Sequence, residues 1–149
     1  MQIILNLQIF LFIIAFILTK KIEIYAVLMI FAFIHEIGHI LIGLALGFKP
    51  KSLKIMPFGL SVTFQDKHIY DKNYKRVEIK NIVIAIAGPI TNFIIMGIAI
   101  LLKWETVAYS NLLIAIFNLI PIYPLDGGRV VKSLLCLTED KRKSFKKSK

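Results

Sequence analysis

Residues 24–48, IYAVLMIFAFIHEIGHILIGLALGF, place two histidines and a glutamate inside an otherwise apolar run. A run of this length is enough for an α-helix that crosses the roughly 30 Å hydrocarbon core of a bilayer. Ionisable side chains are costly at that depth, so they are expected to face protein or a water-filled cavity rather than lipid. The stretch therefore predicts a membrane helix that carries a buried polar site.

The rest of the 149-residue chain is also apolar, with 57% hydrophobic residues and a mean hydropathy of +0.73. Further apolar runs cover residues 3–18, 82–102 and 107 to about 125. Lys20 and Lys21 follow the first run, which lacks the basic start and small-residue cleavage site of a signal peptide, so we interpret it as a retained helix. We predict an all-α polytopic membrane protein of about four transmembrane helices, the first of them an N-terminal helix.

The formal net charge of +10 comes from basic residues that lie between and after the apolar runs. They are concentrated in residues 49–80 and from Arg129 onward, so the positive-inside rule places both termini in the cytoplasm. This distribution does not suit a soluble basic face, and we expect no nucleic-acid partner. Cys136 is the single cysteine, so neither an intrachain disulfide nor a cysteine metal cluster can form.

Two shorter segments depart from the helical pattern. Residues 53–64 alternate apolar and polar positions around a Pro-Phe-Gly break, which predicts a short membrane-associated β-hairpin. Pro121, Pro124 and Asp126-Gly127-Gly128 interrupt the last apolar run, and irregular backbone at membrane depth indicates a site. A short helix is expected over residues 130–137. We predict one domain over residues 1–149, with a core of about 22–132 and a basic cytoplasmic tail of 138–149.

His35 and His39 are four residues apart, which puts both imidazoles on one face of a helix and within reach of one metal ion. Glu36 follows the first histidine and is placed to take a proton from water that the metal activates. Such a pattern also occurs by chance in soluble helices, where the histidines are surface residues. The apolar surroundings favour the metal site.

A catalytic zinc ion normally takes three protein ligands, so a third is needed. Asp126 is the acidic residue of the last apolar run and stands on its proline-broken segment, and the glycines after it allow close approach of the backbone. We predict Asp126 as the third ligand; the alternative is that it caps the following helix. His68 lies in the charged loop and is expected to be solvated.

Two asparagines inside apolar runs are further candidates. Asn118 precedes Asp126 by eight residues, and Asn92 follows Gly88-Pro89. Either amide could donate to an oxyanion or hold an unwound substrate backbone, or could serve in interhelical hydrogen bonding. For Asn118 the catalytic role is favoured, and for Asn92 substrate binding and helix packing stand equal.

These residues resemble the site-2 protease family of intramembrane zinc metalloproteases. The resemblance rests on His35-Glu-Ile-Gly-His39, on Ala87-Gly-Pro-Ile-Thr-Asn92 and on Asn118-Leu-Ile-Pro-Ile-Tyr-Pro-Leu-Asp126-Gly-Gly, and it is strongest to the branch of the stage IV sporulation protease FB. It implies a three-helix catalytic core in addition to the N-terminal helix. It also implies Zn²⁺ held by His35, His39 and Asp126, with Glu36 as catalytic base and Asn118 as a residue that positions substrate or binds the oxyanion.

The resemblance also implies hydrolysis of peptide bonds in or next to transmembrane segments of membrane-anchored regulatory proteins, with pro-sigma factor processing as one instance. The expected partners are such a substrate and the lipid bilayer of a bacterial cell, and a homo-oligomer or a regulatory membrane partner is compatible with them. The alternatives are a membrane metal-ion transporter or sensor and an inactive relative that only binds helices. Glu36 favours the hydrolase, because a transporter has no need for a non-ligand glutamate beside the first histidine.

Overall fold

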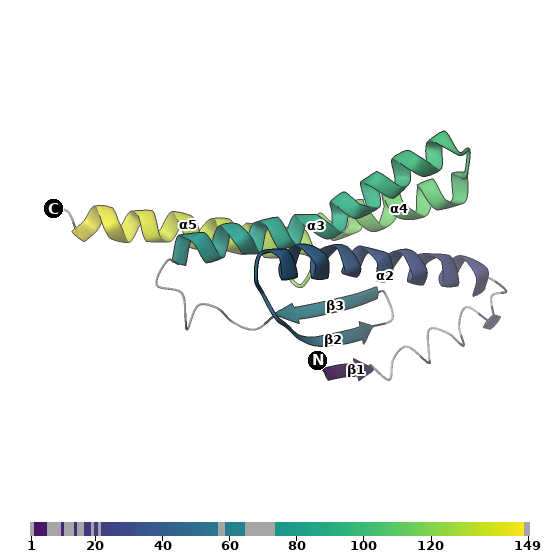
Figure 1. The fold of residues 1–149 in the computed structure, drawn as a ribbon, viewed down its shortest axis with the longest axis horizontal. Coiled ribbons are helices and arrows are strands. Elements are labelled where there is room, and N and C mark those ends of the chain that lie inside the picture. The colour runs from purple at the N-terminus through teal and green to yellow at the C-terminus, as the bar shows by residue number, and fades with distance from the viewer. Residues whose placement is uncertain are drawn as a thin grey trace.

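A computed structural model of the chain describes residues 2–5, 10, 14, 17, 18, 20, 22–56, 59–64 and 74–147. The described elements (Figure 1) are β1 (Gln2–Leu5), α2 (Ile22–Ala45), β2 (Pro50–Met56), β3 (Gly59–Phe64), α3 (Tyr74–Leu101), α4 (Glu105–Asn118) and α5 (Asp126–Lys147). The helix α3 contacts α2, α4 and α5, and the sheet contacts α2 (Figure 1). The long helices therefore form one layer, and the small sheet lies against it.

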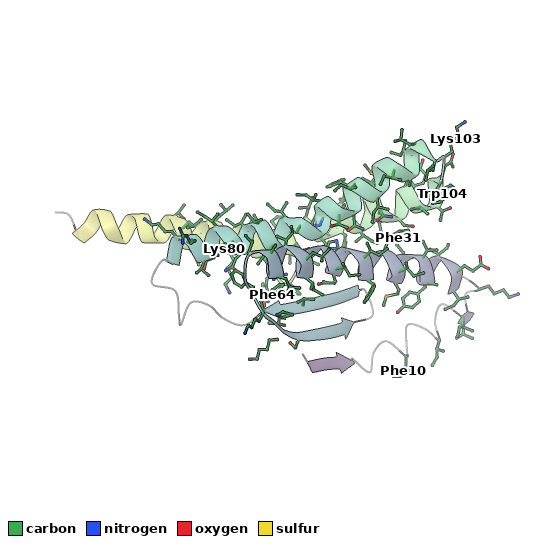
Figure 2. All side chains as sticks on the ribbon, in the orientation of Figure 1. Phe10, Phe31, Phe64, Lys80, Lys103 and Trp104 are labelled. Carbon is green, nitrogen blue, oxygen red and sulfur yellow. The ribbon has the colours of Figure 1, made fainter. Side chains whose placement is uncertain are left out.

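Within the described residues, two helices are long and apolar enough to cross a membrane, namely α2 and residues 75–101 of α3. Their outer faces carry exposed apolar side chains, such as Ile30 at 57% and Leu41 at 61% exposure on α2. Lys80 lies toward one end of α3, and Lys103 and Trp104 lie at the other (Figure 2). Apolar helices with basic and aromatic residues at their ends are typical of membrane proteins, because those side chains favour the interface with water.

The predicted four crossings are confirmed only in part. The helix α4 has 14 residues and is therefore about 21 Å long, which is less than the thickness of the hydrocarbon core. The predicted N-terminal helix begins instead with the strand β1. Phe10, Ile14, Ile17 and Leu18 of the same run are helical, and residues 6–9, 11–13, 15 and 16 lie outside the described part of the chain. A run of β-branched and long apolar residues is compatible with either state, and pairing with β2 selects the strand for β1.

The predicted hairpin is confirmed: β2 and β3 are antiparallel, and Leu53 is opposite Val62 in their register. The strand β1 adds to β2 in parallel, with Gln2 opposite Ser52, which the sequence pattern did not predict. The resulting order is β1-β2-β3, so β3 is an edge strand, and it is the strand nearest α2 (Figure 1). Phe64 at its end packs against the buried cluster of Phe48, Val77 and Ile84 and thereby ties the sheet to the helices.

The predicted break in the last apolar run is also confirmed. The helix α4 ends at Asn118, residues 119–125 are irregular, and α5 begins at Asp126. The helix α5 is longer than the predicted 130–137 and continues to Lys147, through most of the segment predicted as a tail. Between Arg129 and Lys147 the sequence has no glycine or proline to end a helix, which accounts for the difference.

Candidate metal centre

The side chains of His35, His39 and Asp126 converge in the interior of the helical layer. Their exposures are 3%, 1% and 5%, and each offers one ligand atom to a common point. Helix α2 supplies both imidazoles from successive turns, while the first residue of α5 supplies the carboxylate. The structure therefore brings together the three residues that the sequence predicts as metal ligands.

The distances within this group are those of atoms around one small cation. Nε2 of His35 and Nε2 of His39 are 3.1 Å apart, and Oδ2 of Asp126 lies 3.0 Å from the first and 3.1 Å from the second. Ligand atoms at about 2.1 Å from a tetrahedral zinc ion are about 3.4 Å from one another. Only a few tenths of an ångström separate the observed spacing from that of a zinc site.

The opposite nitrogen of each ring is bound to helix α3. Nδ1 of His39 donates to the carbonyl of Ile84 at 2.7 Å, and Nδ1 of His35 donates to Oδ1 of Asn92. In a neutral imidazole the other nitrogen, Nε2, then carries a lone pair and no proton. Two lone pairs and a carboxylate oxygen thus face one another in a buried position, and a cation between them would relieve their repulsion.

Gly88 of α3 provides the space that a metal ion requires. A Cβ atom at this position would lie 2.3 Å from Nε2 of His39 and 2.6 Å from Nε2 of His35. Zinc–nitrogen bonds are about 2.0–2.1 Å, so a methyl group there would take nearly the place of the ion. The donor set of two imidazoles and one carboxylate and the space left by Gly88 both fit zinc.

Glu36 lies beside this group on α2 but is not one of the converging ligands. Its side chain is buried, with 6% exposure, and Oε2 accepts a hydrogen bond of 3.2 Å from the backbone N–H of Val62 in β3. The Glu36 carboxylate is thus next to the three converging side chains and next to the edge strand β3. From there it can take a proton from a water molecule that attacks a peptide held between the strand and those side chains. This is the place in which a general base is expected.

The break before α5 positions the carboxylate. Gly127 and Gly128 pack directly on the irregular segment, where added Cβ atoms would lie 2.2 Å from the carbonyl oxygen of Leu119 and 2.5 Å from the carbonyl carbon of Ile122. The close backbone approach predicted for these glycines is therefore confirmed. Asp126 is also the first residue of α5, so its place at the start of this helix is compatible with its place among the three converging side chains.

A family model for peptidase family M50 matches residues 23–104 and 99–149. The chain belongs to peptidase family M50. Its fold is similar to that of a solved site-2 protease from Methanocaldococcus jannaschii, with a TM-score of 0.75 and 24% identity over 89% of this chain and 66% of that one. The helices around His35, His39 and Asp126 are thus arranged as in a solved protease.

Curated proteins that are similar to this chain in sequence are named as zinc metalloproteases or as a sporulation protein. A zinc metalloprotease of Methanocaldococcus jannaschii is 33% identical over 74% of this chain and 35% of its own length. A putative zinc metalloprotease of Synechocystis is 34% identical over 68% of this chain and 28% of its own length. The stage IV sporulation protein FB of Bacillus subtilis is 29% identical over 88% of this chain and 45% of its own length. The chain spans less than half the length of each of these M50 relatives.

The two asparagines that the sequence singled out lie in different settings. Asn92 is fully buried, accepting from His35 and donating from Nδ2 to Oδ1 of Asn111 at 2.8 Å, and these are interhelical hydrogen bonds of the kind considered for it. Asn118 is half-buried at the end of α4, and its Nδ2 donates to the carbonyl of Ile114 in the same helix at 3.0 Å. His68 lies outside the described residues.

Two contacts of the M50 site were missed by the sequence reasoning. Asn111 was passed over, although a polar amide in an apolar run is the same signal that singled out Asn118. Arg129 places Nη1 3.4 Å from Oδ1 of Asp126, the carboxylate oxygen that faces away from the histidines. Its spacing of three residues from Asp126 on one helix face could have suggested this pair.

Proposed function

We propose that this chain is a membrane-embedded zinc metalloprotease that hydrolyses peptide bonds in or next to transmembrane segments of membrane-anchored regulatory proteins. Pro-sigma factor processing is one such reaction, by analogy with the sporulation relative. The observation that carries the proposal is the buried convergence of His35, His39 and Asp126, with Glu36 beside it. Membership of a peptidase family and the names of the relatives as zinc metalloproteases support it.

In this proposal His35, His39 and Asp126 hold the zinc ion. An ion held there would supply Lewis acidity, which would polarise the scissile carbonyl and acidify the attacking water. Oε2 of Glu36 accepts the proton of that water and returns it to the leaving amine. One amide N–H of Asn118 donates to the backbone carbonyl of Ile114. The other N–H can donate to the oxyanion that develops on the scissile carbonyl.

The test of this proposal compares Glu36→Gln with Glu23→Gln, an exposed glutamate at the start of the same helix. Each protein is purified in detergent, its zinc is measured, and it is given a panel of single-span membrane substrates. We expect zinc in all three proteins and cleavage by the parent and Glu23→Gln, with Glu36→Gln slower by about 100-fold or more. Equal cleavage by Glu36→Gln would refute the proposal, as would zinc transport without cleavage by the parent.

We further propose that the substrate pairs with the outer edge of β3. The N–H of Val62 points away from β2 and toward Glu36, so in an antiparallel ladder the N–H groups of Leu60 and Phe64 point the same way. An extended peptide added at this edge would run past the catalytic carboxylate. A helical substrate must unwind to bind in this way, because its own backbone hydrogen bonds otherwise hide the scissile carbonyl.

This pairing is tested by Leu60→Pro against Leu60→Ala. Both variants remove the leucine side chain, but only proline removes the outward N–H. We expect slower cleavage by Leu60→Pro than by Leu60→Ala, with zinc retained in both. Identical cleavage by the two variants would exclude pairing at this position while leaving the metalloprotease assignment intact.

A further inference from the structure

A chain of hydrogen bonds connects the metal ligand His35 to two other helices. Nδ1 of His35 donates to Oδ1 of Asn92 on α3, and Nδ2 of Asn92 donates to Oδ1 of Asn111 on α4 at 2.8 Å. Nδ2 of Asn111 donates in turn to the backbone carbonyl of Val107 at 2.8 Å. Both asparagine side chains are fully buried, at 0% exposure, so these partners are not replaced by solvent.

The direction of this chain is set at its far end. A backbone carbonyl can only accept, so the amide of Asn111 must turn its nitrogen toward Val107 and its oxygen toward Asn92. Asn92 must then turn its nitrogen toward Asn111 and its oxygen toward His35. An amide oxygen also only accepts, so the proton of the neutral His35 ring is held on Nδ1 and the lone pair on Nε2.

Without the hydrogen bond from Nδ2 of Asn92 to Oδ1 of Asn111, the amide of Asn92 could rotate and present its nitrogen to His35. Nδ1 would then have to accept, and the ring proton would move to Nε2, the atom that faces His39 and Asp126. A protonated Nε2 has no lone pair for a metal ion. The asparagine chain thus favours the one neutral form of His35 that can bind zinc.

We propose that Asn111 is a positioning residue for the metal centre: through Asn92 it fixes the tautomer and the ring orientation of His35 before zinc binds. The inference rests on the proposed zinc site and concerns how that site is prepared. Outer partners of metal-binding histidines typically contribute 10–100-fold to metal affinity. Here the direct partner of His35 is Asn92. Asn111 does not contact the imidazole ring and acts by setting the direction of the Asn92 amide.

The first test measures zinc affinity by competition with a chelator, using the full chain in detergent. We expect Asn111→Leu to bind zinc about 10–100-fold more weakly than the parent, while Ser110→Ala, which alters the neighbouring buried polar residue of α4, binds like the parent. Parent affinity in Asn111→Leu would overturn the inference. Absence of zinc binding in the parent would instead refute the proposed function.

A second variant separates positioning from a merely structural role. In the Asn92→Asp variant an ionised carboxylate replaces the amide and can only accept from Nδ1 of His35, whatever residue 111 does. The tautomer should then be independent of Asn111. We expect the double variant Asn92→Asp, Asn111→Leu to bind zinc more tightly than Asn111→Leu alone. A double variant that binds no more tightly would overturn the inference.

The tautomer itself can be read in the metal-free parent, which does not depend on the folding of any Asn111 variant. Nitrogen NMR of labelled histidine at mildly alkaline pH distinguishes protonated from unprotonated ring nitrogens, and His39→Gln and His68→Gln spectra assign the signals. We expect the proton of His35 on Nδ1. A proton on Nε2 in the parent would overturn the inference.

Discussion

Replacement of Gly88 by alanine should abolish zinc binding while leaving most of the fold intact. The new Cβ would lie 2.3 Å from Nε2 of His39 and 2.6 Å from Nε2 of His35, whereas unstrained contacts between heavy atoms of this kind are about 3.5 Å. The rings would have to move by about 1 Å, and that movement takes them from the positions that ligate an ion. The added methyl group also costs about 1–3 kcal/mol of stability as overpacking.

The matched control is Gly97→Ala on the same helix, where an added Cβ has no neighbour within 4 Å. This variant should keep full zinc binding, and the better helix propensity of alanine should stabilise it by about 0.5–1 kcal/mol. Metal content after gel filtration and thermal unfolding with and without zinc measure the two effects. A ligand at about 100 times its Kd stabilises the folded state by about 2.7 kcal/mol, so the parent and Gly97→Ala should unfold at a higher temperature with zinc.

The expected result for Gly88→Ala is no bound zinc and no zinc-dependent shift in its unfolding temperature. One zinc per chain in Gly88→Ala, with the parent's shift, would show that the ion does not lie between the two Nε2 atoms. The proposed position of the metal ion would then be wrong, whatever the cleavage activity.

The remaining predictions concern Asp126 and Asn118. Arg129→Gln should weaken zinc binding by less than about tenfold. Nη1 of Arg129 lies 3.4 Å from Oδ1 of Asp126, and the arginine side chain is 31% exposed, so solvent weakens this ion pair. Competition with a chelator measures the change, and an equal effect of Lys132→Gln, an exposed cation of the same helix, would count against a specific contact. Asn118→Ala should lower the cleavage rate by about 100-fold or more without loss of zinc, if its amide serves the oxyanion. Loss of zinc together with activity would indicate a structural role instead.

Local sequence patterns account for much of the site. The spacing of His35 and His39 follows from helix geometry alone, since residues four apart share a face in any α-helix. The prolines after Asn118 and the glycines after Asp126 predicted the interruption that the structure has at residues 119–125. The alternating pattern of residues 53–64 predicted the β2–β3 hairpin for the same reason, because strand and turn preferences are local.

The boundaries and the number of crossings were less well predicted. Apolar composition does not separate a strand from a helix over a few residues, so β1 was not foreseen in the run of residues 3–18. Nor does it show that the last run gives only the 14-residue helix α4 before the chain turns into α5. These features depend on pairing and packing partners that lie elsewhere in the chain.

By itself, the sequence determined that two imidazoles and a glutamate lie on one apolar helix and that Asp126 follows a broken segment. Only the tertiary structure decided that Asp126 reaches both histidines, that Gly88 leaves room between their Nε2 atoms, and that hydrogen bonds connect His35 to Asn92 and Asn92 to Asn111. The physical reason is that spacing within a helix is fixed by its backbone. The contact of one helix with the next depends on how each is rotated about its axis and how far it slides, which the packing of the whole chain sets.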